Sequence, residues 1–515
     1  MALLIRSLLA TLLALAAGLA AAADSDARFM ALSYHEVIAD DEKITPTAVR
    51  ASDLARQFAW LKVNDFHPVS VDQILAARDG GPPLPPRAIL LTFDDGFKDA
   101  YTRAFPLLKL FNYPAVIALV GKWMDVPDGQ MVDYDGEPVP RGKFLDWEQV
   151  REMQASGLVE VASHSYNLHR GILANPQGNT QPAATTRLFA NGQYEDDAAN
   201  LARLRHELRD SISKHTGKAP RIIVWPYGRS NGAAQQVAAE LGMPIGLTLV
   251  DGFNDASTPT AIWKRQLIEN SPSLQAFAEM LRVTWDPNPG RSVKVDPGTW
   301  PPGEDELSPT LDRLLTLSPN IAFVKPTIVR DGREMPLFPT KLHPVAADKL
   351  NHISWQTERR AGVPVFIDLP DAWLNEPELI ADLARHVNFA GLRLRAAPGS
   401  AVTESIRKAA GRWVWPLQLA YALDRPPTPA QWAALQPGDL VVLPATEENI
   451  AAVPREMARR VLFEFDPSLP PESIARRMNR LEADGFRQFG VAGLPDSVMG
   501  PIFPSLSLRW QPQLP

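Results

Sequence analysis

The sequence predicts an α/β protein in which a first domain, with a parallel sheet that is open or closed into a barrel, precedes a second α/β domain. Short apolar runs alternate with stretches of helical periodicity from Phe29 to about Leu281, which is typical of a parallel sheet. A stretch dense in proline and glycine then interrupts the pattern, and the alternation resumes after it. With 515 residues, 45% of them hydrophobic, the chain is long enough to build two domains.

The first domain contains six apolar runs that we expect to form buried strands. In chain order they are FMALSYHEV, RAILLTFDDG, PAVIALVG, LVEVASHS, RIIVWPYG and PIGLTLV. Helices are expected over EDDAANLARLRHELRDSISKH, where apolar residues recur at helical spacing, and from Asp146, where DWEQ resembles a capping box, to Gly157. In such a fold the active site gathers at the carboxyl ends of the strands.

The domain boundary is placed in the segment WDPNPGRSVKVDPGTWPPGEDELSP. We assign residues 24–285 to the first domain, 286–309 to a linker and 310–515 to the second domain. The second domain repeats the pattern, with expected strands in NIAFVKPTI, VPVFIDLP, FAGLRLRAA and DLVVLPAT. It is shorter than the roughly 250 residues of a full (β/α)8 barrel.

Composition restricts the compartment and the partners. Residues 1–23 have one early basic residue, Arg6, then a Leu/Ala-rich stretch and an A-x-A pattern, which predicts a cleaved secretory signal peptide. The sequence contains no cysteine, which excludes disulfides, thiolate metal sites and a lipidated cysteine. A net charge of −7 gives no indication of nucleic-acid binding. We therefore expect a periplasmic protein with no transmembrane segment in the mature chain.

Two adjacent carboxylates, Asp94 and Asp95, stand in TFDDG at the end of an apolar run. Side chains alternate along a strand, so the two can point in different directions only where the strand ends, and Gly96 permits such a turn. One interpretation divides the pair between two chemical tasks. The alternative is a helix cap for the segment FKDAYTRAFPLLKL.

Two histidines, His164 and His169, follow another apolar run in EVASHSYNLHR. Five residues apart on a helix they would diverge, so we place them on a strand end and the loop after it. With an aspartate from a neighbouring strand end they would form a two-His, one-carboxylate metal site with open positions. A histidine pair alone is usually incidental, but only nine histidines occur in the chain.

Two further candidates lie in RIIVWPYGRSN and LSYHEV. The turn of Trp225, Pro226 and Tyr227 could direct a backbone N–H at a developing oxyanion and offer aromatic walls to a small apolar group. It could also be an ordinary turn. His35 ends the first expected strand, where it could act as a proton donor or simply face solvent.

Together these motifs resemble the polysaccharide deacetylase superfamily, the family 4 carbohydrate esterases. TFDDG resembles its first motif, SHSYNLH its second and WPYG its third. The histidine spacing, the YHEV start and the second α/β domain are most similar to the periplasmic poly-β-1,6-N-acetyl-D-glucosamine N-deacetylases of biofilm systems. The resemblance implies a distorted (β/α) barrel followed by a shortened, glycoside-hydrolase-like α/β barrel.

The resemblance also assigns the metal and the base. It implies that Asp94 is the general base and that Asp95, His164 and His169 hold a divalent metal. Zinc is the expected metal, with cobalt, nickel or iron as alternatives.

The remaining roles follow from the same resemblance. His35 would be the general acid, the Tyr227 N–H would stabilise the oxyanion, and Trp225 and Pro226 would line the acetyl group with Tyr227. One departure is that Val224 and Trp225 replace the arginine that usually precedes the proline of the third motif. This departure leaves the base without its usual arginine partner.

For the second domain the resemblance implies polymer binding with degenerate hydrolase ancestry. Ala396 and Ala397 stand where an acidic pair is expected, although Asp296 is present. A hydrolase that uses Asp368 or Asp371 is the alternative. The tryptophans that could stack on sugar rings, or belong to the core, are Trp300, Trp355, Trp373 and Trp415.

The implied function is metal-dependent N-deacetylation of exported poly-β-1,6-N-acetyl-D-glucosamine, which releases acetate. The implied partners are this polymer and an export porin of the outer membrane. The alternatives are a deacetylase of another polysaccharide, such as peptidoglycan or a chitin-like chain, and a non-catalytic polysaccharide-binding scaffold.

Overall fold

The computed structural model describes residues 27–282, 290–300 and 307–494, and the chain divides into two compact units. Unit 1 comprises Met1–Ile172, Gln181–Thr186 and Glu195–Trp285. Unit 2 comprises Leu173–Thr180, Arg187–Tyr194 and Asp286–Pro515. The expected signal peptide, residues 1–23, lies outside the described residues. Within those residues, no helix has the length and apolar character needed to cross a bilayer.

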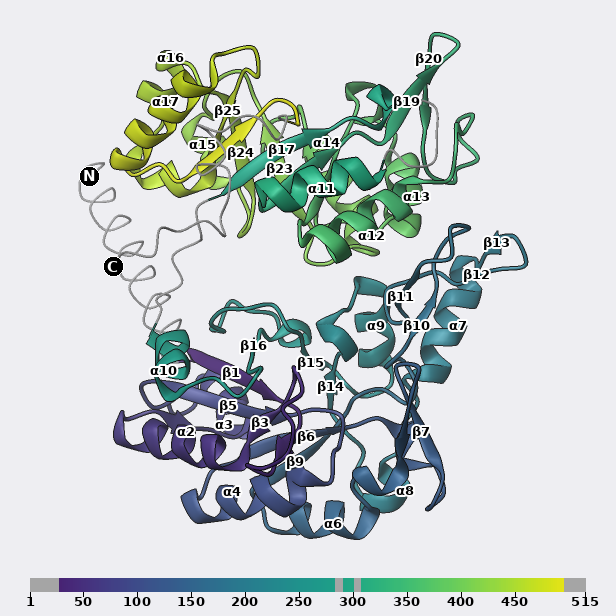
Figure 1. Ribbon diagram of the computed structural model, residues 1–515, viewed down its shortest axis with the longest axis vertical. Helices are drawn as coiled ribbons and strands as arrows, with labels where there is room; N and C mark the ends of the chain where they lie inside the picture. The colour runs from purple at the N-terminus through teal and green to yellow at the C-terminus, as the bar shows by residue number, and fades with distance from the viewer. Residues whose placement is uncertain (1–26, 283–289, 301–306, 495–515) are drawn as a thin grey trace, which may run out of the picture. The chain divides into compact units, whose positions relative to one another are not determined.

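Unit 1 is built on an open, half-barrel sheet of eight strands, and every pairing in it is parallel. The strand order is β15-β14-β9-β6-β5-β1-β16, with β4 beside β5 (Figure 1). The strands are β1 (Phe29–Tyr34), β4 (His67–Pro68), β5 (Ala88–Phe93), β6 (Ala115–Leu119), β9 (Val159–Ser163), β14 (Ile222–Val224), β15 (Ile245–Leu247) and β16 (Gln266–Leu267). The structure confirms the predicted α/β class, and each of the six expected runs contains a strand of this sheet.

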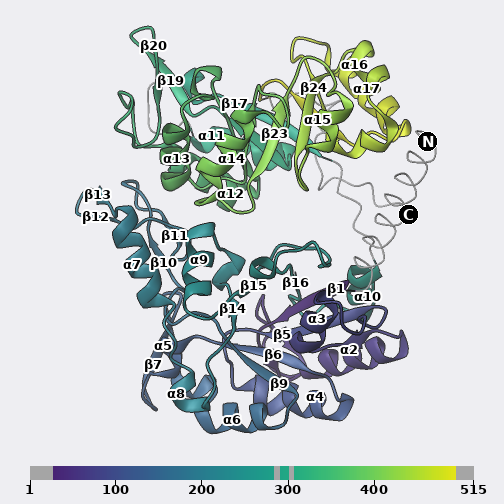
Figure 2. The same ribbon diagram turned by 180° about the vertical axis from the view of Figure 1, so that it is seen from behind.

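Helices connect these strands and are visible from both sides in Figures 1 and 2. They are α2 (Ala51–Val63), α3 (Val71–Arg78), α4 (Phe105–Phe111), α5 (Gly121–Met124), α6 (Trp147–Ala155), α7 (Asp197–Glu207), α8 (Ser213–Thr216), α9 (Gly232–Glu240) and α10 (Leu274–Arg282). The capping box predicted at Asp146 is present, with Gln149 as its partner. The single helix predicted over 195–215 is wrong, because Asp210 accepts the N–H groups of Ile212 and Ser213 and so separates α7 from α8.

The central strand β5 is buried on both faces, as expected for a strand in a covered parallel sheet. Leu91 and Phe93 belong to one hydrophobic cluster, which includes Phe58 of α2. The alternate residue Leu90 belongs to a second cluster, which includes Leu247 of β15. The sheet therefore separates two cores, and β5 ends inside the protein rather than at its surface.

Small two-stranded sheets accompany the two large sheets. They are β2 (Val37–Ile38) with β3 (Val49–Arg50), β7 (Met131–Tyr134) with β8 (Glu137–Pro140), β10 (Gly171–Leu173) with β11 (Thr180–Pro182), β12 (Phe189–Ala190) with β13 (Gln193–Tyr194), and β19 (Thr327–Arg330) with β20 (Arg333–Pro336).

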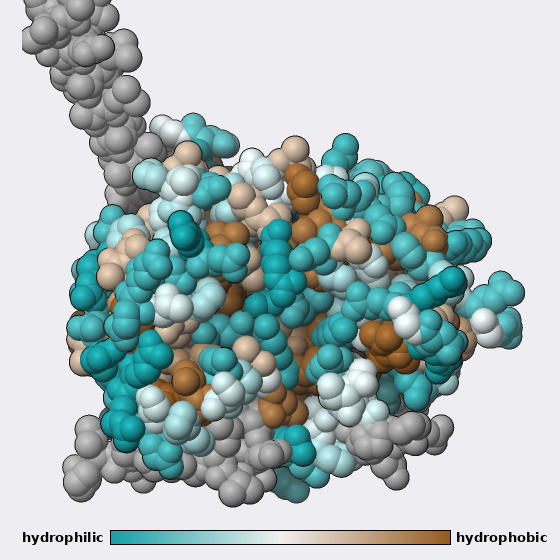
Figure 3. Space-filling model, turned by 90° about the horizontal axis from the view of Figure 1, so that it is seen from above, coloured by the Kyte–Doolittle hydropathy of each residue, from teal (hydrophilic) through white to brown (hydrophobic). Residues whose placement is uncertain are grey.

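Unit 2 contains a closed barrel of eight parallel strands. In order around the barrel they are β17 (Arg291–Val295), β18 (Ile321–Val324), β21 (Val365–Asp368), β22 (Gly391–Leu394), β23 (Gln418–Ala422), β24 (Leu440–Pro444), β25 (Val461–Phe465) and β26 (Gln488–Val491). Its helices are α11 (Leu307–Leu317), α12 (Leu350–Ala361), α13 (Pro377–His386), α14 (Ala401–Gly411), α15 (Pro429–Ala433), α16 (Glu447–Ala452) and α17 (Pro471–Ala483). The molecular face in Figure 3 is mostly hydrophilic, with hydrophobic residues in small separate patches.

The structure corrects the assignment of residues 286–309 to a linker, because β17 lies within them and pairs with both β18 and β26. The flanking prolines and glycines concealed this strand. Residues 291–295 read RSVKV, and their alternating polar and apolar side chains are compatible with a short strand between turns. The barrel is thus complete in strand number although the domain is short.

One glycine of the sheet is predicted to be irreplaceable. A Cβ at Gly246 in β15 would lie 2.0 Å from the carbonyl oxygen of Ala261 and 2.8 Å from Nε1 of Trp225. We expect Gly246→Ala to lower the free energy of unfolding by about 1–3 kcal/mol or more, because backbone cannot yield easily. Urea unfolding measures this change. Gly142→Ala, with no atom near its added Cβ, is the control and should stay within about 0.5 kcal/mol of the parent.

Candidate active site

The four motifs singled out in the sequence end strands of the same sheet. His35 follows β1, the Asp94 and Asp95 pair follows β5, His164 follows β9 and the Trp225 turn follows β14. Parallel strands carry their carboxyl ends to one edge of a sheet, so these side chains are brought to a common rim.

Three side chains from these motifs, Asp95, His164 and His169, converge on one point. Oδ1 of Asp95 lies 3.3 Å from Nε2 of His164 and 3.4 Å from Nε2 of His169. The potential ligand atoms all lie within 4.8 Å of one another, and all three residues are buried. Two imidazole nitrogens and one carboxylate oxygen form a donor set that suits zinc and related divalent metals.

The hydrogen bonds around this cluster leave the ligand atoms available. Nδ1 of His164 lies 2.7 Å from the carbonyl oxygen of Val224, a bond that places its proton on Nδ1 and the lone pair on Nε2. Oδ1 of Asp95 is buried and has no hydrogen-bond partner among the described residues. A buried carboxylate oxygen without such a partner is costly, so the residues fit a metal ion.

The residues of this cluster shift one another's pKa values. Burial raises the pKa of Asp95, but the neighbouring His169 and His164 outweigh burial and hold that pKa well below its usual value. Burial lowers the pKa of His169, and Asp95 reverses this effect and raises it. Asp95 is therefore ionised at neutral pH, as a metal ligand must be.

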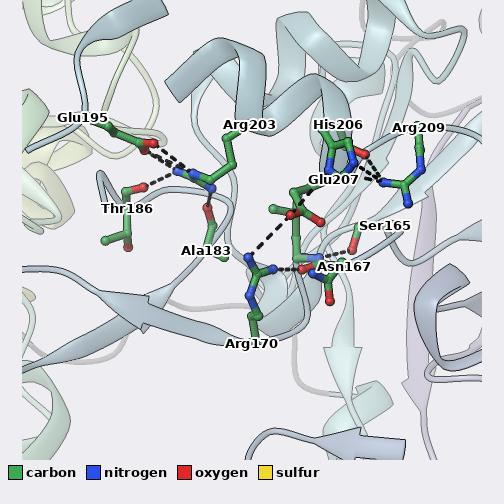
Figure 4. Close-up of polar contacts among 11 residues, drawn as sticks. Ser165, Asn167, Arg170, Ala183, Thr186, Glu195, Arg203, His206, Glu207 and Arg209 are labelled. Carbon is green, nitrogen blue, oxygen red and sulfur yellow. Dashed lines mark hydrogen bonds and ion pairs between the residues drawn. The ribbon is translucent and has the colours of Figure 1, made fainter. Parts of the chain in front are cut away.

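The loop between the two histidines is held by the end of α7 (Figure 4). The carbonyl oxygen of Glu207 accepts the N–H groups of Tyr166, at 2.8 Å, and Asn167, at 3.3 Å. The carboxylate of Glu207 lies 3.5 Å from NH2 of Arg170, directly after His169. Both ends of the loop are thereby fixed, which fixes the separation of the two histidines.

Asp94 is bound to an arginine that the sequence analysis missed. NH1 of Arg265 donates to Oδ1 of Asp94 at 2.8 Å, and both side chains are buried. Burial raises the pKa of Asp94, but Arg265, His35 and His164 lower it, and the net shift is downward. The expectation that the base lacks an arginine partner is wrong, because Arg265 approaches from the segment before β16 rather than from the third motif.

His35 lies beside the same carboxylate, with Nε2 3.9 Å from Oδ2 of Asp94. Its side chain is 11% exposed, so the ring remains accessible from the rim. Ser33 also donates to Oδ2, at 3.3 Å. Asp94 and His35 can therefore act on the same bound molecule.

The turn after β14 has an unusual backbone. Tyr227 has φ 56° and ψ 15°, in the left-handed region that a tyrosine rarely adopts. Its ring lies against His169, with 4.6 Å between ring centroids. Trp225 and Pro226 of the same turn are buried. Their predicted contact with an acetyl group stays a prediction.

A further part of the site that sequence reasoning missed is the β7–β8 hairpin. The Tyr134 hydroxyl donates to Oδ2 of Asp95 at 2.8 Å, and the Tyr227 hydroxyl donates to Asp135 at 2.9 Å. The dipeptide Asp135-Gly136 was the available signal, because Asp-Gly between two short strands is typical of a tight hairpin turn.

In unit 2, the acidic candidates are engaged by arginines. Asp368 accepts from Arg393 at 2.7 Å, and Asp371 accepts from Arg395 at 3.1 Å. A cavity of about 500 Å³ at the carboxyl ends of β17, β18 and β21 is lined in part by Trp300. The other residues singled out there are placed as follows: Asp296 lines the same cavity, Trp373 is buried, Trp355 and Trp415 are half-buried, and Ala396 and Ala397 follow β22.

The buried pair of Arg265 and Asp94 generates a prediction. Arg265→Gln should lower the free energy of unfolding by about 3–5 kcal/mol, because it leaves a buried carboxylate without its cation. The pKa of Asp94 is lowered in the folded protein, so the pair stabilises fully above the unfolded pKa of about 3.9 and this stabilisation is lost as pH falls through the folded pKa. Urea unfolding from pH 2 to pH 8 should therefore show a deficit that is constant above about pH 4 and shrinks below it.

The matched control is the double variant Asp94→Asn with Arg265→Gln. If the two residues stabilise through each other, the double variant loses less than the sum of the single variants. Strict additivity of the two losses would contradict the prediction.

A family model and curated proteins both match this chain. Residues 81–246 match the family model for polysaccharide deacetylase. The poly-β-1,6-N-acetyl-D-glucosamine N-deacetylase of Escherichia coli K12 is 36% identical over 367 residues, which are 68% of this chain and 54% of that protein. The chain thus spans about half the length of the curated relatives it matches.

Two solved structures resemble unit 1 in sequence. The BpsB deacetylase domain from Bordetella bronchiseptica is 46% identical, with 48% of this chain and 97% of that chain covered and a TM-score of 0.44. A de-N-acetylase from Aggregatibacter actinomycetemcomitans is 37% identical, with 49% and 99% covered and a TM-score of 0.46. The 36% identity to the E. coli protein over 68% of this chain, with the family match at residues 81–246, shows that the chain belongs to the polysaccharide deacetylase family.

Proposed function

We propose that this protein is a metal-dependent N-deacetylase of poly-β-1,6-N-acetyl-D-glucosamine, with Asp94 as base and with Asp95, His164 and His169 as metal ligands. One observation carries the proposal. The carboxylate of Asp94 is buried and ionised, and Arg265 binds it. It lies directly beside the ligand cluster of Asp95, His164 and His169 without belonging to that cluster. A purely structural pair of aspartates would not need two histidines on one member and an arginine on the other.

The residues divide the chemistry of amide hydrolysis. Asp94 takes the proton of the attacking water, whose oxygen forms a bond to the carbonyl carbon. His35 gives a proton to the amide nitrogen as the C–N bond breaks, so that acetate and a free amine leave. The backbone N–H of Tyr227 is proposed to donate to the carbonyl oxygen as it becomes negative. When bound, a divalent metal supplies Lewis-acid chemistry that polarises the carbonyl and makes water more acidic.

The substrate is inferred from the relatives. The E. coli protein carries the name of a poly-β-1,6-N-acetyl-D-glucosamine N-deacetylase, and relatives in staphylococci carry the same name. We propose zinc as the metal, with cobalt, nickel or iron as alternatives, and a periplasmic location reached through a cleaved signal peptide. An outer-membrane export porin is the proposed partner of the process.

We further propose that residues 24–285 form the catalytic domain and that unit 2 binds the polymer without cleaving it. The arginine partners of Asp368 and Asp371, together with Ala396 and Ala397, support this division. Hydrolysis of a glycosidic bond normally requires two carboxyl groups that flank the bond. Trp300 offers a ring to a bound sugar at the barrel cavity.

Acetate and free-amine release from β-1,6-linked N-acetylglucosamine oligomers tests the function. We expect release with added zinc or cobalt, loss after chelation and recovery when metal returns. Asp94→Asn should lower kcat by about 10²–10⁴-fold, because general base catalysis is worth this much. Its circular dichroism and metal content should match those of the parent.

The outcomes separate the alternatives. Acetate release from β-1,4-linked oligomers alone would support N-deacetylation but contradict the proposed β-1,6-linked substrate. If the protein bound the polymer but released no acetate from oligomers of either linkage, the function would be that of a binding scaffold and not of an enzyme. Release that persists in Asp94→Asn would overturn the assignment of the base.

A further inference from the structure

The β7–β8 hairpin is anchored in the protein by one face. Val132 is fully buried and belongs to a hydrophobic cluster with Phe97, Trp123 and Phe144, and Tyr134 packs against the same cluster. Side chains alternate along a strand, so residues 132 and 134 face inward together. Asp133, between them, is exposed. The hairpin therefore has a defined inner face that ends in Tyr134.

The turn of the hairpin gives the next residue a fixed direction. Asp135 and Gly136 have φ 54° and 92°, the left-handed values of a two-residue turn that suits right-twisted strands. Oδ1 of Asp133 accepts the N–H of Gly136 at 2.8 Å and closes the turn. The direction of Asp135 is thus set by the backbone.

The two adjacent residues at this tip reach two different parts of the site. The Tyr134 hydroxyl donates to Oδ2 of Asp95, and the Asp135 carboxylate accepts the Tyr227 hydroxyl. The first contact engages the carboxylate oxygen that faces away from the histidines. The second engages the side chain whose backbone stands in the left-handed region.

Each contact restricts the geometry of one residue of the site. A carboxylate can rotate and offer either oxygen or both, and a hydrogen bond on Oδ2 leaves Oδ1 directed at His164 and His169. A tyrosine in the left-handed region costs conformational energy, and a hydrogen bond at the far end of its side chain helps to hold it there. The orientation of the Tyr227 N–H depends on that backbone conformation.

We propose that the tip of the β7–β8 hairpin is a positioning element in which Tyr134 orients the metal ligand Asp95 and Asp135 holds Tyr227 in its left-handed conformation. For Asp135 the inference rests on the proposed function, because the Tyr227 N–H matters only if it faces a reacting carbonyl. For Tyr134 it rests only on the ligand cluster. The two halves can therefore be tested separately.

Tyr134→Phe tests the first half, because it keeps the ring in its cluster and removes only the hydroxyl. Zinc affinity is measured by competition with a chromophoric chelator, and we expect it to weaken about 10–100-fold. Glu137→Gln, on the exposed side of the same hairpin, is the control and should bind zinc like the parent. Equal zinc affinity of the two variants would overturn the role of Tyr134.

Asp135→Gly and Asp135→Asn test the second half. Glycine keeps the left-handed turn without the acceptor, whereas asparagine keeps both. We expect kcat to fall about 10–100-fold in the glycine variant, with KM and zinc affinity within about twofold of the parent, and to recover mostly in the asparagine variant. Equal kcat in the two variants would overturn the role of Asp135.

A readout without turnover keeps the inference distinct from the proposed function. The chain has eight tyrosines, so ¹⁹F NMR of fluorotyrosine-labelled protein can follow Tyr227, with its signal assigned through Tyr227→Phe. The Tyr227 signal should move or broaden in Asp135→Gly and stay in place in Asp135→Asn. If the parent released no acetate, the proposed function would fail, while this signal and the zinc affinities would still decide whether the tip positions the site. An unmoved signal in Asp135→Gly would overturn the positioning of Tyr227.

Discussion

Burying two adjacent carboxylates at the end of one strand is the constraint on which the rest of unit 1 depends. Asp94 is 2% exposed and Asp95 is 1% exposed, and each would cost several kcal/mol if left unpaired. The backbone separates them, so that Asp94 receives an arginine and Asp95 receives two histidines and a tyrosine. Because the partners come from three other segments, the sheet and its loops must be in place before the pair can be buried.

Sequence reasoning found the parts of the site that have local signatures. The sequence indicates a strand followed by Asp-Asp-Gly and a strand followed by two histidines in a loop. Both can be recognised because the change from apolar to polar residues falls within a few positions. Arg265 has no such signature. It lies 171 residues from Asp94, in a segment with one of the shortest strands of the sheet, and only tertiary structure shows which acid it meets.

The hairpin and the barrel show two further reasons why prediction stopped short. Asp135-Gly136 indicates a turn, but the direction in which the hairpin packs is set by Val132 and its cluster, which a single sequence cannot reveal. Strand β17 has the alternation of a short strand, yet the prolines and glycines around it favoured a linker. In both cases the local sequence pattern was compatible with the observed structure, but contacts with residues remote in the sequence determined it.

The closure of the barrel has a consequence for the order of events during synthesis. Arg291 of β17 pairs with Phe489 of β26, so the first and last strands of the barrel are neighbours. A ribosome releases them nearly two hundred residues apart, and until the last strand emerges both β17 and β25 present open edges. Such edges are templates for pairing with another chain. A nascent chain that stalls before β26 would therefore be exposed to aggregation, even though unit 1 had already been released in full.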